Sequence, residues 1–579
     1  MELTLIAVVG VISIVAVAAF SDRLGLAAPL SLVVVGIALS FIPGMPHPMA
    51  EPEWILAGVL PPLLYSTAVN MPAHDFRRNF KAISGLAVVL VAVTTLGAGW
   101  LFHWLLPDLG WPTAFALGAV ISPTDAVAAT SVGKKLGLPS RLVTVLEGEG
   151  LVNDASALVL LRSAIAAIAG SVSVWGIAGD FLYAVVIAIA VGLVVGYVNV
   201  RIRALLDDTV LNTAISFVIP FIAFVPAEEF EASGVLAVVV AGLVTGHQSP
   251  RYLRAQDRIA EATNWRTLAF LLESAIFLLM GLGLKRLIDE VHDDGLGAWR
   301  ALTIGLVASA LVIVVRMVFC WPLVEALRND RKKAAQSVPK LEQIQARIDA
   351  APADDERFGT KRFEHMKTRV TRVSADVQFQ LNEALGWRGG VVLAWSGMRG
   401  AITLAAAQSL PEDVPDRPQL ILIAYVVAVT TLLLQGLSLP WVIRTVKVPG
   451  DDEDRLRQEY VDLLGELSAA ASDVLDDPDL TSPDGHPVDP EVLNRVRDTS
   501  LMRARPTPAE DEEATPDLAA KADQREQYLT LRLAVLDAER RRLLALRSLG
   551  TYSSRALGNA QKMLDVEEAR MQQLSDAGR

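Results

Sequence analysis

Long apolar segments alternate with short polar loops over the first 445 residues of the chain. A bilayer core is about 30 Å thick, so a helix needs roughly 20 apolar residues to cross it. Thirteen segments fit this description, the ninth being short: 3–20, 25–42, 54–70, 82–106, 113–132, 142–170, 180–200, 209–227, 230–246, 267–286, 300–325, 388–410 and 418–443. The pattern predicts an all-α polytopic membrane protein of about 13 transmembrane helices, with the lipid bilayer as a partner.

The charges of the loops give the orientation. Loops after odd-numbered segments carry basic residues, namely Arg23; Arg77, Arg78 and Lys81; Lys134, Lys135 and Arg141; Arg201 and Arg203; Arg251, Arg254, Arg258 and Arg266; Arg328, Arg331, Lys332 and Lys333; and Arg444 and Lys447. Arg417 is the only basic residue in the loops after even-numbered segments. Because short cytoplasmic loops are enriched in Lys and Arg, the N-terminus is expected outside and the C-terminus in the cytoplasm of a cell membrane. The chain begins without a basic leader, so a retained first helix is favoured over a cleaved signal peptide.

Two polar stretches divide the chain into domains. Residues 1–448 form the predicted transmembrane domain, interrupted by a charged cytoplasmic loop at 327–387 that is helical in part. Residues 449–579 form a cytoplasmic tail with a helical start, a Pro- and Asp-rich linker at about 477–520, and one long helix from about 521 to 572. Solvated helix is the favoured interpretation of both stretches, and the tail is a candidate regulatory segment.

Composition narrows the function class. The chain of 579 residues is 52% hydrophobic with a net charge of −12, which gives no reason to expect nucleic-acid binding. Cys320 is the only cysteine, which excludes an internal disulfide framework and a cysteine-cluster metal site. The sequence contains no nucleotide-binding loop and no nucleophile–base set, so an enzyme, an ATP-driven pump and a bound cofactor are not expected.

Charged residues inside a membrane segment are costly and therefore mark candidate functional sites. They are Asp125, Glu149, Asp154, Arg162, Glu273, Arg316 and Arg399. Two arginines, Arg316 and Arg399, can neutralise two glutamates, Glu149 and Glu273, in buried structural ion pairs. The role of Arg162 stays open between a helix interface and an outward-reaching side chain.

Two segments carry signals of a discontinuous helix. In the fifth, Pro123 disfavours helix at Ser122 and is followed at once by Thr124 and Asp125. In the twelfth, glycines bracket Met398-Arg399. If the seventh segment is a linker, the two are equivalent positions of two inverted repeats, and their crossed, discontinuous helices form a site near the membrane midplane.

Several motifs resemble those of monovalent cation/proton antiporters of the sodium/proton exchanger type, in their bacterial form. They are LPPLLY (60–65), ISPTDAVA (121–128), EGEGLVNDA (147–155), AEEFEASGVLA (227–237), ESAIFLLMGL (273–282) and SGMRGA (396–401). The resemblance covers about residues 1–445 and implies a thirteen-helix fold, a homodimer, and exchange of Na+ for H+ at one carboxylate.

The resemblance also implies roles for individual residues. Asp154 would bind the ion and the proton, with Asn153 as its neighbour in the pair typical of electroneutral members. Thr124 and Asp125 would lie near the ion on the unwound helix, with Glu149 paired to Arg316 and Glu273 to Arg399. Two departures concern the coordination: Gly150 stands where the family often has Ser, and Ser66 where many relatives have an acid.

The expected mechanism is competition of a cation and a proton for Asp154. Oxygen ligands suit a hard monovalent cation such as Na+, and they would come from Asp154, from the Thr124 hydroxyl or carbonyl, from Ser122 and from water. Exchange would be one-for-one if only Asp154 changes state, while the choice among Na+, Li+ and K+ stays open. Two alternatives remain: a cation channel or uniporter of the same fold, and a membrane sensor that signals through the tail.

Overall fold

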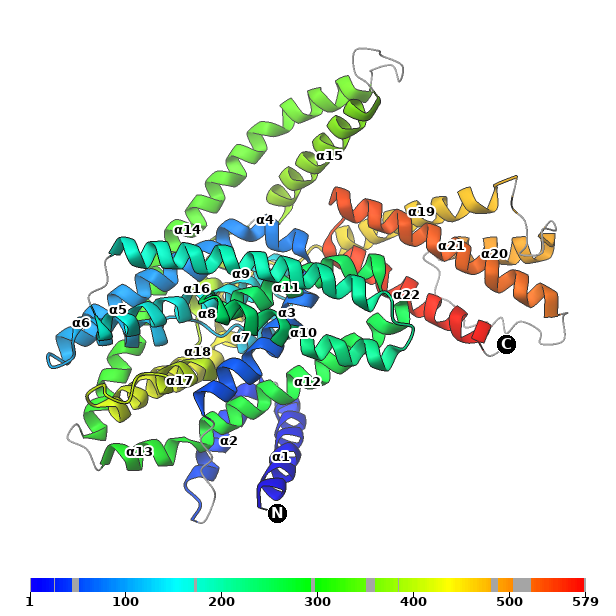
Figure 1. The fold of residues 1–579 in the computed structure, drawn as a ribbon. Helices are drawn as coiled ribbons and strands as arrows, with labels where there is room; N and C mark the ends of the chain where they lie inside the picture. The colour runs from blue at the N-terminus through cyan, green and yellow to red at the C-terminus, as the bar shows by residue number, and fades with distance from the viewer. Residues whose placement is uncertain are drawn as a thin grey trace. The chain divides into compact units, whose positions relative to one another are not determined.

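The computed structural model describes residues 2–24, 27–43, 51–170, 174–292, 297–349, 360–383, 385–478, 480, 488–502 and 522–576, and within these residues the regular secondary structure is entirely helical. The helices are α1 (Glu2–Leu24), α2 (Ala28–Ser40), η1 (Trp54–Val59), α3 (Leu60–Asn70), α4 (Ala73–Ser84), η2 (Gly85–Leu90), α5 (Val91–Leu105), α6 (Trp111–Val120), α7 (Val127–Lys135), α8 (Ser140–Ala169), α9 (Val174–Arg203), α10 (Thr209–Glu229), α11 (Gly234–Tyr252), α12 (Ala255–Leu282), α13 (Leu284–His292), α14 (Ala298–Asp349), α15 (Thr360–Asn382), α16 (Trp387–Trp395), α17 (Ala401–Gln408), α18 (Arg417–Val446), α19 (Glu453–Leu475), α20 (Pro490–Met502), α21 (Ala522–Leu549) and α22 (Ser554–Asp576), with η1 and η2 being π-helical (Figure 1).

The chain divides into two compact units, each built from separate stretches of sequence. The membrane unit comprises Met1–Gln248, Thr263–Arg331 and Glu383–Gly450. The tail unit comprises Ser249–Ala262, Lys332–Asn382 and Asp451–Arg579. The tail unit therefore includes the connection between α11 and α12, which lies far from the tail in sequence.

Seven helices among the described residues are long and apolar enough to cross a bilayer: Ala73–Leu105, Ser140–Ile168, Ala178–Arg203, Thr209–Glu229, Ala255–Val291, Ala298–Ile348 and Arg417–Val446. Val8–Ser21, Ala28–Ser40, Trp54–Asn70 and Trp111–Val120 are shorter apolar helices. The prediction of an all-helical polytopic membrane protein is confirmed, while the count of thirteen spans stays a prediction.

The fifth and twelfth predicted segments are each interrupted. Pro123 lies in a non-helical stretch at 121–126 that separates α6 from α7, and the stretch 396–400 separates α16 from α17. Elsewhere helix continues beyond the predicted limits. The eleventh segment, predicted at 300–325, is part of α14, which runs on to Asp349 through much of the predicted cytoplasmic loop. The tenth, predicted at 267–286, covers the second half of α12, which begins at Ala255 and ends at Leu282, and the first residues of α13.

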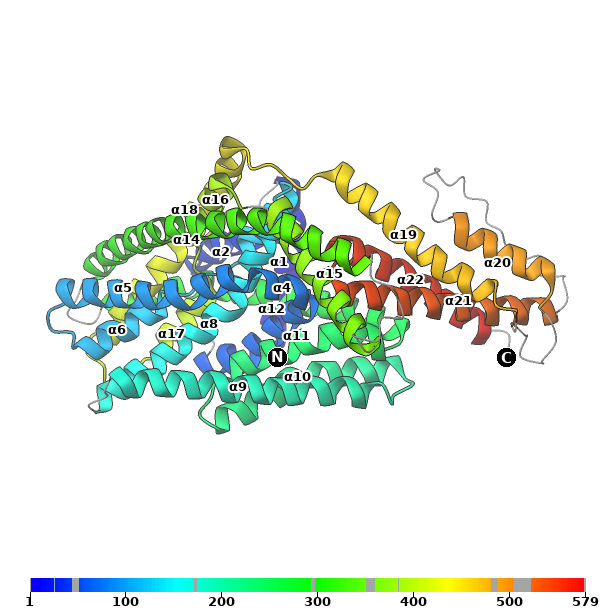
Figure 2. The same cartoon turned by 90° about the horizontal axis from the view of Figure 1, so that it is seen from above.

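The two largest apolar clusters of the membrane unit each join several helices. One joins residues of α2, α6, α14 and α16–α18, and the other joins residues of α3, α10 and α11 with Trp265 of α12. Helix α8 contributes to both, with Leu146 and Leu161 in the first and Leu151 and Ala155 in the second. Asp154 therefore lies on a helix that belongs to both apolar clusters. Figure 2 shows α9 and α10 side by side, a packing that the residue contacts confirm.

The tail unit has a core of its own. Helices α19, α21 and α22 pack against one another (Figure 1). The leucines buried between them include Leu467, Leu536 and Leu557. Helix α20 adds Val492 and Val496 against α19 and α21, so part of the predicted 477–520 linker is helical. The predicted single helix at 521–572 is wrong. It breaks at Gly550, whose φ of +69° is a left-handed conformation that favours glycine and ends α21.

Candidate ion-binding site

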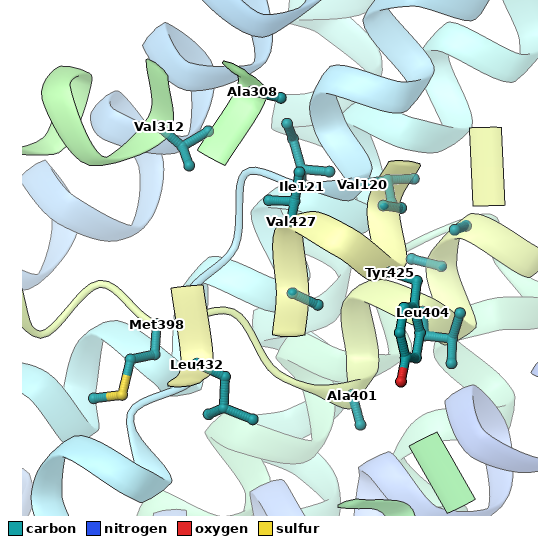
Figure 3. Close-up of a cluster of buried hydrophobic side chains, with 14 of the residues drawn as sticks. Val120, Ile121, Ala308, Val312, Met398, Ala401, Leu404, Tyr425, Val427 and Leu432 are labelled. Carbon is teal, nitrogen blue, oxygen red and sulfur yellow. The ribbon is translucent and has the colours of Figure 1, made fainter. Parts of the chain in front are cut away.

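The two interrupted helices meet at their non-helical stretches. The Asp125 N–H donates to the Met398 carbonyl at 2.7 Å, which joins stretch 121–126 directly to stretch 396–400. A Cβ atom at Gly400 would collide with the Asp125 carboxylate, so only glycine allows this approach. Figure 3 shows the buried apolar side chains around the crossing, including Ile121, Val312, Met398 and Leu432.

Charged side chains of opposite sign cap the two helix ends at the interruption between α6 and α7. Asp125 accepts from the Val127 N–H at 2.8 Å and so places a carboxylate at the N-terminus of α7. Arg399 donates through Nε to the Ile121 carbonyl at 3.1 Å, at the C-terminus of α6, and through Nη1 to the Gly397 carbonyl. A negative group suits a helix N-terminus and a positive group suits a C-terminus. Each charge also satisfies a backbone group that the interruption leaves without a helical partner.

Glu149 of α8 and Arg316 of α14 form a buried, bidentate ion pair. Arg316 Nη2 lies 2.8 Å from Glu149 Oε2, and Nη1 contacts Oε1. The two side chains are 1% and 2% exposed, so each charge depends on the other for compensation. Arg316 Nε also donates to the Leu393 carbonyl of α16 at 3.1 Å, so the pair ties three helices together.

Thr124 and Asn153 extend this network into the interruption. The Thr124 hydroxyl donates to Glu149 Oε1 at 2.6 Å. The Asn153 amide donates to the Thr124 carbonyl at 2.6 Å and to its hydroxyl oxygen at 3.0 Å. Asn153 Oδ1 is buried and has no hydrogen-bond partner among the described residues. Both Thr124 oxygens expected as cation ligands are therefore already engaged by Asn153, with one lone pair left on each.

Asp154 differs from its neighbours. It is 6% exposed, and within the described part of the chain no group hydrogen-bonds or ion-pairs with its carboxylate. Asp154 follows Asn153, whose amide donates to the Thr124 carbonyl, so Asp154 lies on the part of α8 that contacts the interruption at 121–126. Ser122 is also buried there, and its hydroxyl donates to the Ala119 carbonyl at 2.8 Å, which leaves its oxygen able to accept or ligate.

One expected pairing is not formed. Arg399 makes its contacts with carbonyl groups, and no ion pair joins it to Glu273 among the residues described. The resemblance implied this pair, and the two residues are intramembrane charges of opposite sign, but the broken end of α6 supplies Arg399 with another partner. Arg399 also donates its backbone N–H to the Thr431 hydroxyl of α18 at 3.1 Å. Thr431 was not among the predicted site residues; its hydroxyl within the apolar segment 418–443 is the sequence signal, and the structure shows that it is fully buried.

Arg162 lies at a helix interface. Its guanidinium pairs with Glu228 of α10 and donates to the Ala232 carbonyl at 3.3 Å. Glu228 in turn accepts from the Gly234 N–H at 2.9 Å, at the start of α11. Arg162 therefore connects α8 to the turn between α10 and α11, within the AEEFEASG motif.

Comparisons with known proteins agree on one family. A family model described as the transmembrane sodium/hydrogen exchanger matches residues 10–445. An uncharacterised Na+/H+ exchanger of Mycobacterium bovis is 29% identical over 559 residues, which cover 95% of this chain and 92% of that protein. A sodium, potassium, lithium and rubidium/H+ antiporter of Bacillus pumilus is 27% identical over 427 residues, 71% of this chain and 57% of that protein.

A solved structure is similar in fold. The sodium proton antiporter MjNhaP1 from Methanocaldococcus jannaschii superposes with a TM-score of 0.53 at 17% identity, over 77% of this chain and 99% of that chain. At this identity the likeness concerns the fold alone.

Proposed function

We propose that this chain, which belongs to the transmembrane sodium/hydrogen exchanger family, exchanges Na+ or a related cation for H+ by competition at Asp154. Members of this family are transporters rather than enzymes, and they exchange monovalent cations for protons. The observation that carries the proposal is the Asp154 carboxylate, which is buried, lacks a described partner and lies beside the crossed interruptions. A bound cation or a bound proton neutralises the same charge, so each excludes the other. The empty, charged form is the costly one to move through the membrane.

Asn153 accounts for the proposed one-for-one stoichiometry. An electroneutral exchange follows if one carboxylate changes state in the cycle, and an amide beside Asp154 adds no second titrating group. Glu149 is already compensated by Arg316, and the Asp125 carboxylate caps α7. Thr124, Ser122 and the free Asn153 Oδ1 are the proposed neutral oxygens around the cation.

The two apolar clusters suggest how the site could open to each side of the membrane in turn. We propose that the bundle carrying the crossed interruptions moves against the bundle of α3, α10 and α11, with α8 between them. The same proposal includes thirteen spans, two inverted repeats that place the α6–α7 and α16–α17 interruptions at equivalent positions, and a homodimer. The N-terminus would lie outside and the C-terminus in the cytoplasm, as the alternation of basic loops supports.

Inverted membrane vesicles from cells lacking their own sodium/proton antiporters test the proposal. Once respiration has acidified the vesicles, Na+ should dequench a pH-sensitive dye, and Li+ and K+ added separately across a pH series would rank the cations. The rate should not change when the membrane potential is collapsed by a lipophilic ion. Dequenching by none of these cations, with the protein present in the membrane, would reject the function. A rate that depends on the potential would reject only the one-for-one count.

Gly150 is the position where cation preference should respond to a single change. A Cβ atom there would lie 3.2 Å from the Ala126 Cβ, so serine fits after a small adjustment. Gly150→Ser adds a hydroxyl oxygen one turn before Asp154 and should lower the half-saturating Na+ concentration about fivefold, since a hydrogen-bond-strength contact contributes about 1 kcal/mol. Gly150→Ala adds the same Cβ without the oxygen and should not. Equal effects of Ser and Ala would mean that crowding, not coordination, is responsible.

A further inference from the structure

The connection between α11 and α12 is held by two arginine side chains. Arg540 of α21 donates through Nε and Nη2 to the Pro250 carbonyl at 2.9 and 2.5 Å, and through Nη2 to the Leu253 carbonyl at 2.9 Å. These carbonyls lie at the C-terminal end of α11, where backbone acceptors lack helical partners and a positive charge is favourable. Arg258, in the first turn of α12, also donates to the Leu253 carbonyl.

Helix α22 supplies the matching carboxylates. Asp565 binds Arg258 with both oxygens, Oδ2 lying 3.1 Å from Nε and Oδ1 contacting Nη2. Each side chain of this pair is only 9% exposed. Glu568 comes three residues after Asp565 and therefore lies on the same face of α22. Its Oε1 lies 3.5 Å from Arg540 Nη1. Two guanidinium groups and two carboxylates compensate one another here, as buried charges require.

The same connection is continuous with helices of the membrane unit. Helix α11 continues back to Gly242, where a Cβ would collide with Ala68 of α3, so these helices are in close contact. Helix α12 continues through Trp265 to Glu273. The ring centroid of Trp265 lies 5.3 Å from that of Tyr65 in α3. A restraint on residues 249–262 therefore acts on the ends of two helices of the proposed transport machinery.

We propose that the α11–α12 connection is a docking surface for the tail, that Arg540 and Asp565 are its two points of attachment, and that the docked tail restrains transport. Charge-assisted, bidentate contacts of this kind are strong and directional. They fix the end of α11 and the start of α12 to a bundle with a hydrophobic core of its own. Releasing them frees the connection without altering a residue of the proposed ion site.

Hydrogen exchange of the full-length protein in detergent tests the docking by itself. Arg540→Gln and Asp565→Asn should each speed amide exchange in residues 249–262 by about tenfold, because truncating one partner of a buried charge pair weakens it strongly. Arg541→Gln is the matched control, since Arg541 is the next residue and pairs with Asp537 while 70% exposed. Unchanged exchange in both test variants would overturn the docking.

The restraint rests on the proposed function and is measured separately. In vesicles, Arg540→Gln and Asp565→Asn should raise the maximal exchange rate about two- to tenfold, by shifting the population toward the released form. The charge reversal Arg258→Asp with Asp565→Arg should return both readouts toward the parent values, which excludes misfolding as the cause. Faster amide exchange with an unchanged or lower transport rate would overturn the restraint. An inactive parent protein would reject the proposed function and leave the docking result intact.

Discussion

Substitution of Asp154 by asparagine should reduce cation-driven proton movement to the level of vesicles that lack the protein. Asparagine keeps the size of the side chain but can neither release a proton nor compensate a cation. Because Asp154 has no described hydrogen-bond or ion-pair partner, the substitution breaks no contact that holds helices together. The loss should therefore appear in transport and not in folding.

The control for this experiment is the same change at an exposed position. Asp180→Asn lies near the start of α9 with its side chain exposed, and it should transport as the parent does. Asp154→Asn should match the parent in membrane abundance, in elution as a single species and in melting temperature. Cation-dependent dequenching by Asp154→Asn at an appreciable rate would place the exchanging group elsewhere. Asp125 and Glu273 would then be the next acids to replace.

Sequence alone predicted the features that local chemistry determines. Pro123 and the glycines around Met398 marked both interruptions, because proline removes a helical donor and glycine permits the approach of another backbone. Asp154 was identified because a charged residue in an apolar membrane segment is energetically costly and therefore marks a candidate functional site. These signals depend on residues close to one another in the chain.

Partners far apart in sequence were harder to predict. Arg316 is 167 residues from Glu149, and the family resemblance, not local chemistry, indicated the pair that the structure forms. Charge balance and the family resemblance assigned Arg399 to Glu273, whereas the carbonyl at the end of α6 is its partner. The Thr124 oxygens were expected to face the cation, but the geometry of Asn153 engages both of them. Charge counting predicts that buried ions are compensated, and only the fold decides by which group.

The second large effect is expected at the Glu149–Arg316 pair. Glu149→Gln leaves the Arg316 guanidinium buried without a counter-charge, a change that typically costs about 3–5 kcal/mol. Glutamine retains an oxygen that can accept from the Thr124 hydroxyl, so the loss reports the ion pair and not that hydrogen bond. We expect a much lower melting temperature and reduced abundance of the folded protein in the membrane.

A double variant distinguishes the net stabilisation by the Glu149–Arg316 ion pair from the free-energy cost of leaving one buried charge uncompensated. Glu149→Gln with Arg316→Met removes both charges and keeps an unbranched apolar side chain against α16, so it should melt well above Glu149→Gln alone. The order parent, double variant, single variant in melting temperature is the expected result. It would mean that the pair connects α8, α14 and α16 chiefly by compensating charge, independently of the cation chemistry at Asp154. A single variant that melts with the parent would show that Arg316 finds adequate compensation in the Leu393 carbonyl and the surrounding network.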